Sequence, residues 1–275
     1  TLALRLSEQG HQVTIFESAN EIGGLAGVWQ IGDLTWDKHY HVTLLSDSFT
    51  KKIVGELGLL NEFEWVETKT GFYTDGKLVS MSNTLEFLKF PPLDLISKFR
   101  LGGTIFYAAR VKDWKALEKI SVQEWLTKLS GKKTFEKMWL PLLKAKLGNA
   151  YRETNAAFIW ATIQRMYAAR NSGLKKEMFG YVRGGYSTVL KRFAEVLHEK
   201  GVEIRLNSKV LNAKSQRSKD AKIVLEYKSK TEDQKLKTNE FDKVILTCPS
   251  NIAAQICPQL TEQERLKHSS IKYQG

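Results

Sequence analysis

The stretch QVTIFESANEIGGLAG, residues 12–27, constrains the fold more than any other part of the sequence. Its first five residues are a largely apolar, partly β-branched run that predicts a short strand, and this run ends on a single acid, Glu17. Three glycines follow at Gly23, Gly24 and Gly27. Glycines let a backbone approach a bulky ligand closely and leave its N–H groups unhindered. The stretch therefore indicates either an ordinary strand and turn or the edge of a nucleotide site.

The residues before this strand predict the back half of a βαβ unit. Residues 1–9 have the pattern of a helix, and Gly10 stands where a helix stops. In dinucleotide-binding units a glycine-rich turn holds the pyrophosphate, and an acid about 20 residues farther on binds the ribose hydroxyls. Glu17 stands where that acid is expected, which places the glycine-rich turn before Thr1. We therefore expect the sequence to be a fragment.

The same order of elements returns near the C-terminal end. Residues 187–210 predict a helix capped by Ser187 and stopped by Gly201, followed by a strand that has Val202, Ile204 and Leu206 on one face.

Two further strands are predicted after it, at residues 221–227 and 241–249, with the polar connection 228–240 between them. The apolar run from Val244 to Leu246 is typical of a strand buried on both faces. Together these patterns predict an α/β domain with a Rossmann-like layer and a β-meander.

The middle of the chain has a different pattern. Residues 47–170 are rich in Leu, Phe, Trp and Lys with helical spacing, and residues 71–81 contain a hairpin signal at Asp75-Gly76. We expect a mostly helical substrate domain at residues 47–183, inserted into a discontinuous α/β domain formed by residues 1–46 and 184–275.

Two local signals refine the helical insert. Ser121 and Glu124 have the spacing of a capping box, and the pair Pro91-Pro92 predicts a break between helices.

Charge and cysteine content narrow the function classes. The net charge of +12 comes from 42 Lys and Arg against 30 Asp and Glu, but the basic residues are scattered and no zinc-finger, RRM or helix-turn-helix signature accompanies them. We therefore expect no nucleic-acid partner. Cys248 and Cys257 are too few for a disulfide framework or a metal knuckle, so we expect no metal site and a cytoplasmic location.

The opening stretch carries a resemblance. GHQVTIFESANEIGGLAG is similar to the second strand and following loop of the FAD-dependent amine oxidase superfamily, which includes phytoene desaturases and protoporphyrinogen oxidases. In that family the acid binds the adenosine ribose of FAD and the glycine loop passes along the cofactor. The resemblance assigns these roles to Glu17, Gly23, Gly24, Leu25, Ala26 and Gly27. Leu25 favours the desaturase-like members, because amine oxidases proper tend to have Arg there.

A second match is WDKHYHVTL, residues 36–44, which resembles the family's F-D-x-G-x-H stretch near the isoalloxazine end of the cofactor. Asp37 and His41 keep the pattern, whereas His39 replaces the glycine. The resemblance implies a flavin-side role for His41. The alternative is a surface turn, because a lone histidine is often structural.

A third match, FGYVRGGYSTVLKRF, is similar to the family's Y-x-x-G-G-(M/Y)-x-x-L segment, in which the chain returns to the FAD domain. Gly184 and Gly185 mark the return, and the strand after the helix carries Val210, the residue whose backbone contacts adenine in the family. Residues 241–256 resemble the family's D-x-V-(I/V)-x-A-x-P strand and turn. The family's final Gly-Asp motif does not occur before Gly275, which again predicts a fragment.

The resemblance implies a desaturase- or oxidase-like flavoenzyme that transfers a hydride from an apolar or amine-type substrate to N5 of FAD. It assigns no catalytic residue and no protein partner. Two alternatives stay open: a flavin isomerase like UDP-galactopyranose mutase, and a non-catalytic nucleotide-binding module.

The composition of the helical insert indicates what kind of substrate the protein binds and where in the cell it acts. Residues 87–110 are rich in aromatic and aliphatic side chains, which suits an apolar small-molecule substrate. Interspersed Lys and Arg are also compatible with peripheral contact to an anionic membrane. We favour the alternative of a buried helical core with solvated Lys tips.

Overall fold

The computed structural model describes residues 1–39, 41–69, 71–74, 76–81, 84–170, 178–216, 222–230 and 235–273. Its α-helices are α1 Leu2–Glu8, α2 Ser48–Glu56, α3 Thr84–Lys89, α4 Leu95–Ala108, α5 Trp114–Leu117, α6 Val122–Ser130, α7 Lys132–Thr134, α8 Leu140–Leu147, α9 Ala156–Arg170, α10 Gly185–Glu199, α11 Ser250–Ile256 and α12 Glu262–Ser269. Helical turns of other types are η1 Gly24–Ala26, η2 Leu60–Glu62, η3 Phe135–Trp139 and η4 Gly148–Glu153.

The strands form several small sheets. They are β1 Thr14–Phe16, β2 Val28–Ile31, β3 Leu34–Asp37, β4 Thr43–Leu44, β5 Phe63–Glu67, β6 Gly71–Thr74, β7 Lys77–Ser80, β8 Met178–Val182, β9 Glu203–Arg205, β10 Ser208–Ser215, β11 Ile223–Ser229 and β12 Leu236–Phe241. The pairings are β1 with β9, β2 with β3, β6 with β7, β4-β8-β5 and β10-β11-β12.

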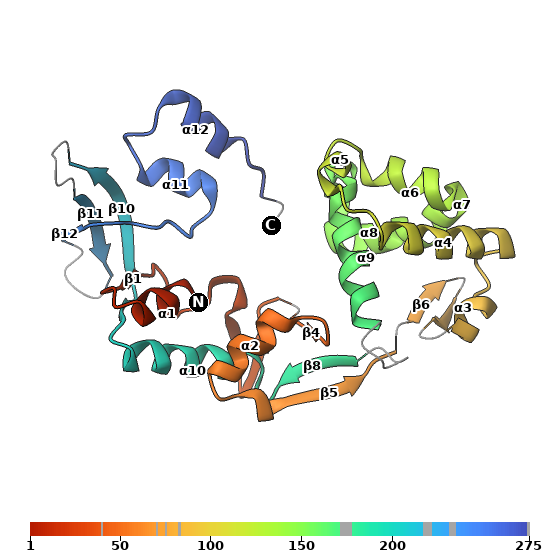
Figure 1. The fold of residues 1–275 in the computed structure, drawn as a ribbon, viewed down its shortest axis with the longest axis horizontal. Coiled ribbons are helices and arrows are strands. Elements are labelled where there is room, and N and C mark those ends of the chain that lie inside the picture. Colours follow the sequence, from red (N-terminus) through yellow and green to blue (C-terminus); the bar gives the residue numbers. More distant parts are fainter. Residues whose placement is uncertain are drawn as a thin grey trace.

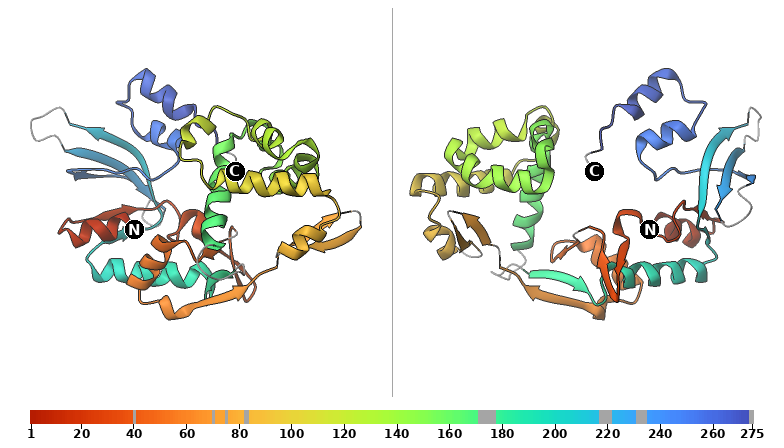
Figure 2. Two further views of the ribbon diagram at one scale, coloured as in Figure 1. Left: turned by 45° about the vertical axis from the view of Figure 1, so that its right-hand side comes forward. Right: turned by 180° about the vertical axis from the view of Figure 1, so that it is seen from behind.

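These elements are arranged as an arc (Figure 1). Helices α1 and α10 lie at one end with the sheet β10–β12, helices α4 to α9 gather at the other end, and strands β5 and β8 run between the two groups. The view from behind in Figure 2 shows the same arrangement. The two ends of the arc therefore have separate hydrophobic cores. No helix in the described part of the chain combines the length and apolar character needed to cross a membrane.

Strands β1 and β9 pair in parallel, so the two α/β segments predicted at opposite ends of the sequence meet directly. Thr14 lies opposite Glu203, and Phe16 lies opposite Arg205. Beyond the last pair, the Glu17 N–H donates to the Arg205 carbonyl at 2.9 Å. Helix α1 precedes β1 and helix α10 precedes β9, each separated from its strand by a glycine with positive φ, Gly10 and Gly201.

The start of α10 corrects one prediction. Ser187 does not cap the helix, because α10 begins at Gly185 with Gly184 as its N-cap. The Ser187 hydroxyl instead donates to the Gly184 carbonyl at 2.7 Å. The physical reason is the glycine pair: Gly184 and Gly185 have φ of 80° and 72°, so the chain turns into the helix two residues earlier than the serine suggests.

The prediction of a last strand at residues 241–249 is also wrong. The antiparallel sheet takes its third strand, β12, from residues that the sequence pattern assigned to a polar connection, and β12 ends at Phe241. Val244 and Leu246 pack on the sheet's hydrophobic cluster, whereas Ile245 is 58% exposed. The segment therefore buries one side, not both, and pairs with no strand among the residues described.

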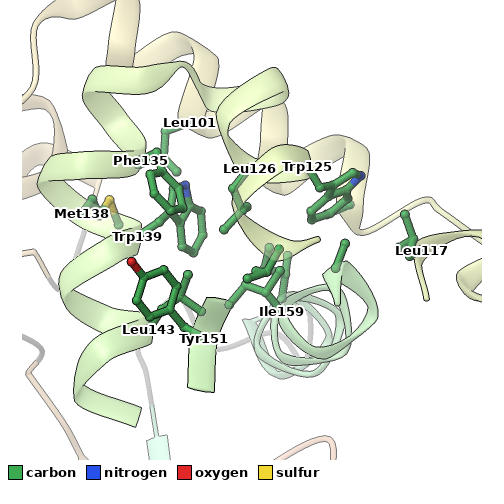
Figure 3. Close-up of a cluster of buried hydrophobic side chains, with 14 of the residues drawn as sticks. Leu101, Leu117, Trp125, Leu126, Phe135, Met138, Trp139, Leu143, Tyr151 and Ile159 are labelled. Carbon is green, nitrogen blue, oxygen red and sulfur yellow. The ribbon is translucent and has the colours of Figure 1, made fainter. Parts of the chain in front are cut away.

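The helical end of the arc has the larger core. Figure 3 shows side chains of this core, which come from α4, α5, α6, η3, α8, η4 and α9: Leu101, Leu117, Trp125, Leu126, Phe135, Met138, Trp139, Leu143, Tyr151 and Ile159. Leu101 and Leu126 are fully buried, at 0% exposed. Burial on this scale explains why short helices with modest intrinsic stability hold together here.

The structure contains some of the local features predicted for the insert and lacks others. Ser121 caps α6 by accepting the Glu124 N–H at 3.1 Å, but the reciprocal bond of a capping box is missing among the described hydrogen bonds. A complete box occurs instead at Thr261 and Glu264, at the start of α12. The hairpin β6–β7 turns at Gly76, with Asp75 outside the described residues, and Pro91-Pro92 separates α3 from α4.

Two ion pairs join the helical end to the rest of the chain: Lys272 pairs with Glu153, in η4, at 2.9 Å, and Arg165 pairs with Asp47. The Arg165 guanidinium, on α9, donates Nε–H to Asp47 Oδ1 at 3.0 Å and contacts Asp47 Oδ2 as well. Its Nη2 also donates to the Val42 carbonyl at 3.1 Å, and Asp47 Oδ2 accepts the Leu44 N–H at 2.8 Å. Asp47 therefore connects β4 to α9 across a large separation in sequence.

This pair predicts a dependence of stability on pH. Burial by itself raises the pKa of Asp47, but the hydrogen bonds from Arg165 and from the Leu44 N–H outweigh it and lower that pKa below its usual value. A carboxyl with a depressed folded-state pKa stabilises the fold above its unfolded pKa, about 3.9, and loses that contribution as the pH falls below it. Asp47→Asn should cost about 1 kcal/mol at neutral pH, measured by chemical denaturation.

The variant should also flatten the loss of stability between about pH 5 and 3. The matched control is Asp33→Asn, which changes an exposed carboxylate in the β2–β3 turn and should leave the pH profile as it is. An unchanged acid profile in Asp47→Asn would show that the pair contributes nothing.

Candidate functional site

The predicted ribose acceptor, Glu17, stands immediately after the end of β1. Its carboxylate Oε1 accepts the Ala19 N–H at 2.8 Å and the Ser18 hydroxyl at 3.3 Å. Within the described part of the chain, Oε2 receives no hydrogen bond. The backbone of Glu17 is held on both sides, because its carbonyl accepts the Ser208 N–H at 2.8 Å. The site therefore offers a fixed carboxylate with one oxygen free to accept a hydroxyl donor.

The glycine loop that follows is folded against α10. Gly23 has φ of 119°, and a Cβ added there would lie 2.5 Å from Leu190 Cδ1. Gly24 has φ of 53° and faces open space. The backbone conformation therefore favours glycine at both positions, and at Gly23 a side chain would also force the end of the Leu190 side chain to move.

The end of the loop is tied to the next segment. Gly27 is buried, and its carbonyl accepts the Lys38 N–H at 2.9 Å. The Lys38 ammonium also pairs with Glu21 at 3.1 Å, across the loop. Leu25 is 77% exposed between these anchors. The predicted residues Gly23, Gly24, Leu25, Ala26 and Gly27 thus form one closed loop with Leu25 at its exterior.

Asp37 links the second and third motifs. Its Oδ1 accepts the Tyr186 N–H at 3.2 Å, in the first turn of α10. A Cβ added to Gly185 would lie 3.1 Å from the same oxygen, so the carboxylate sits directly over the glycine pair. Sequence reasoning matched Asp37 to a motif but did not predict this contact, and Tyr186 was not singled out.

His41 joins this cluster through its ring. The imidazole lies against Tyr186, with ring centroids 4.4 Å apart, and its Nδ1 is 3.9 Å from Asp37 Oδ2. That Nδ1 is buried and has no hydrogen-bond partner among the residues described. Burial raises the pKa of Tyr186, and a hydrogen bond with Thr43 opposes the shift. The cluster therefore holds a buried imidazole nitrogen with unused hydrogen-bonding capacity.

The histidine that replaces the family's glycine causes no backbone strain. Asn207 is the non-glycine residue with a positive φ in the described chain, so His39 has an ordinary backbone conformation. His39 is exposed, and Tyr40 lies outside the described residues.

Val210 lies on β10, in the antiparallel sheet at the same end of the molecule as Glu17. It lies opposite Tyr227, next to an irregularity in the β10–β11 register between Val210 and Asn212. Val210 packs in the hydrophobic cluster that includes Phe16, the residue immediately before Glu17. The structure therefore brings the predicted positions on β10 and at the end of β1 near each other.

A groove of about 690 Å³ adjoins the glycine loop. It is lined by Asn20, Glu21 and Ile22, by one face of α10, and by Val202, Ile204 and Leu206 around β9. None of the eight predicted site residues lines it. It neighbours the candidate site but is lined neither by Glu17 nor by the cluster of Asp37, His41 and Tyr186.

The comparisons with known proteins come from sequence and from structure. A family model described as flavin containing amine oxidoreductase matches residues 1–275. No curated protein matches the chain.

Several solved structures share the fold. An oxidoreductase from Methanosarcina mazei has a TM-score of 0.69 at 15% identity, covering 97% of this chain and 60% of that one. Putrescine oxidase bound to putrescine has a TM-score of 0.68 at 17% identity, covering 98% and 59%. A fatty acid isomerase from P. acnes that produces CLA has a TM-score of 0.70 at 14% identity, covering 99% and 62%. The chain thus spans about 60% of the length of these structures, and the similarity shows a mixed helix and strand fold.

The loop geometry predicts unequal effects for two neighbouring glycines. Gly24→Ala should cost about 1 kcal/mol, because it places an L side chain at positive φ in open space. Gly23→Ala should cost about 1–2 kcal/mol more, because its Cβ also collides with Leu190. Chemical denaturation of both variants measures the difference, and Leu190→Ala should recover part of the loss caused by Gly23→Ala. Equal losses in the two glycine variants would contradict the packing of this loop on α10.

Proposed function

This chain belongs to the flavin containing amine oxidoreductase family, and from this premise we propose that it is part of an enzyme that transfers a hydride from an apolar or amine-type substrate to N5 of FAD. The match confirms the family and the flavin cofactor that the sequence motifs predicted. The substrate and the direction of transfer are our proposal.

One observation carries the proposal: three motif segments distant in sequence contact one another. The Asp37 carboxylate joins the segment 36–44 to the glycine pair at Gly184-Gly185, and Gly23 packs on Leu190 of the helix that this pair begins. A set of unrelated surface turns would have no reason to meet in this way. The shared contacts support a single site built from residues 17–27, 37–41 and 184–210.

The residues present fit FAD. Glu17 has a free carboxylate oxygen at a strand end, which is where ribose hydroxyls bind in dinucleotide folds. The loop at Gly24 leaves open space where a side chain would stand. The buried His41 Nδ1 lacks a partner within the described chain, so it has capacity left for a ligand.

We propose the finer architecture on the same grounds. The parallel pair β1–β9 with its preceding helices supports a Rossmann-like layer, which residues 1–46 and 184–275 would share as one discontinuous domain. Residues 47–183 would then form the substrate domain, with the helical core in Figure 3 as its centre.

Each predicted residue has a role in this scheme. Glu17 would accept ribose hydroxyls, the loop from Gly23 to Gly27 would line the cofactor, the Val210 backbone would contact adenine, and His41 would serve the flavin end. Asp37 is a positioning residue, because it holds the turn into α10 and stands beside the His41 ring. Bound FAD supplies the electron acceptor, and the protein supplies position and electrostatics.

A second candidate function has some support. The fatty acid isomerase from P. acnes has a similar fold, so this architecture also suits a flavin isomerase. A mutase acting on a nucleotide sugar would belong to the same class. We place it second, because the family description names oxidoreductases.

The Glu17 assignment predicts a loss of FAD affinity. Glu17→Ala should weaken FAD binding by about 1–3 kcal/mol, which is about 5- to 150-fold in Kd, because it removes a charged acceptor. Fluorescence titration of the full-length apoprotein with FAD measures this. Glu17→Gln, which keeps one acceptor oxygen, should lose less. Equal affinity in wild type and Glu17→Ala would rule out the assignment.

A second experiment separates the two candidate functions. In the absence of oxygen, an apolar or amine substrate should bleach the flavin of the full-length holoenzyme if the enzyme is an oxidoreductase. An isomerase should turn its substrate over without lasting bleaching, and a mutase only after prior reduction. Bleaching by none of these compounds, in a protein that binds FAD, would overturn the proposed hydride transfer.

A further inference from the structure

The outer side of α4 is apolar and exposed. Leu95, Ile96 and Phe99 are 65%, 75% and 78% exposed, and Phe106 and Tyr107 are 54% and 52% exposed. On the neighbouring α3, Leu85 and Leu88 are 70% and 48% exposed. We call these seven side chains the α3–α4 apolar face. Exposed apolar area of this extent marks an interaction surface.

The opposite side of the same helix is already buried. Leu101 and Ala108 are 0% exposed and pack in the helical core. A helix that is apolar on all sides normally lies inside a protein or a membrane. Because one side of α4 is packed in the helical core, its outer side is the part that a binding partner would cover.

No described residue covers this outer side at its centre. A Cβ added to Gly102 or Gly103 would meet no atom within 4 Å. The two glycines lie between Phe99 and Phe106, one turn from each, so they leave the helix backbone open there.

The charge around the face is predominantly positive. Residues 95–112 contain no Asp or Glu but three exposed basic residues, Arg100, Arg110 and Lys112, whereas Lys98 is buried and donates to the Leu88 carbonyl at 2.7 Å. The Arg110 guanidinium lies over the Phe106 ring, 3.3 Å from its centroid, and Lys112 is exposed at the end of the stretch.

The two acids beside the face and another cation have polar partners. Glu86, on α3, accepts the Ser80 hydroxyl at 2.6 Å. Asp94, just before α4, accepts the Ser97 N–H at 2.8 Å and pairs with Lys133 at 2.7 Å. The Arg100 guanidinium donates to the Leu129 and Lys128 carbonyls, which places its charge at the edge of the face. The border of the apolar face is therefore net positive, with Lys89, Arg100, Arg110 and Lys112 against Glu86 and an Asp94 that is paired with Lys133.

We propose that the α3–α4 apolar face inserts into the interfacial region of a membrane that contains anionic phospholipid. Apolar side chains on a helix lying in the membrane plane, bordered by Lys and Arg, bind such surfaces through burial and charge attraction. A second copy of this chain fits less well, because two faces brought together would oppose positive borders. The proposal does not depend on the reaction catalysed.

Vesicle sedimentation of the full-length holoprotein tests the proposal. The protein should sediment with vesicles that contain phosphatidylglycerol, and at least about tenfold less with vesicles of phosphatidylcholine alone. High salt should weaken the binding, because it screens the charge attraction.

Variants locate the surface. Phe99→Asp should lower binding at least about tenfold, because it places a charge in the inserted face. Phe49→Asp is the matched control: Phe49 is 85% exposed on α2, away from this face, and its variant should bind as wild type does. Lys112→Glu should weaken binding to vesicles that contain phosphatidylglycerol and should not change binding to vesicles of phosphatidylcholine alone. The visible spectrum of bound flavin checks in each variant that the protein is folded.

Three outcomes would overturn the proposal. The first is no sedimentation with either vesicle. The second is equal binding by wild type and Phe99→Asp. The third is a wild-type protein that does not bind vesicles, combined with a Phe99→Asp variant that loses thermal stability or loses dimer mass in ultracentrifugation. That result would show that another segment or a second copy covers the face. A milder variant, Phe99→Ser, keeps the test valid if Phe99→Asp fails to fold.

Discussion

The contact between the Asp37 carboxylate and the first turn of α10 is the interaction on which the rest of the site depends. Asp37 accepts the Tyr186 N–H and stands 3.1 Å from where a Gly185 Cβ would be. Because both glycines before Tyr186 have positive φ, the chain can enter α10 at this point and bring β9 alongside β1. Without that turn, Glu17 and Val210 would have no common surface.

The sequence was most informative where backbone constraints are local. The parallel strands, the glycine stops and the hairpin at Gly76 follow from glycine conformation and residue alternation, and the structure contains them. The family motifs also led to the right family. Ser187 misled because a serine near a helix start suggests a cap, whereas the glycine pair before it begins the helix sooner.

Long-range packing could not be read from the sequence. The segment 241–249 has the composition of a buried strand, yet its burial depends on partners that local pattern does not specify. The hairpin β2–β3 was missed, although Gly32-Asp33 between apolar runs signals its turn. The meeting of Asp37 with Tyr186 had no local signal, because 149 positions separate the two residues.

The proposed FAD site and the apolar face lie on different parts of the fold. The first is built from β1, α10 and β10, and the second from α3 and α4 at the helical end of the arc in Figure 1. A flavin site joined to a membrane-facing helical domain would suit a substrate too apolar to dissolve in water.

Hydrogen–deuterium exchange of the full-length protein, with and without FAD, tests the central claim most directly. If residues 17–27, 37–41 and 184–210 form one site, FAD should slow exchange in all three segments together and leave α11 and α12 unchanged. Protection in only one of the three, or in none, would contradict a shared site.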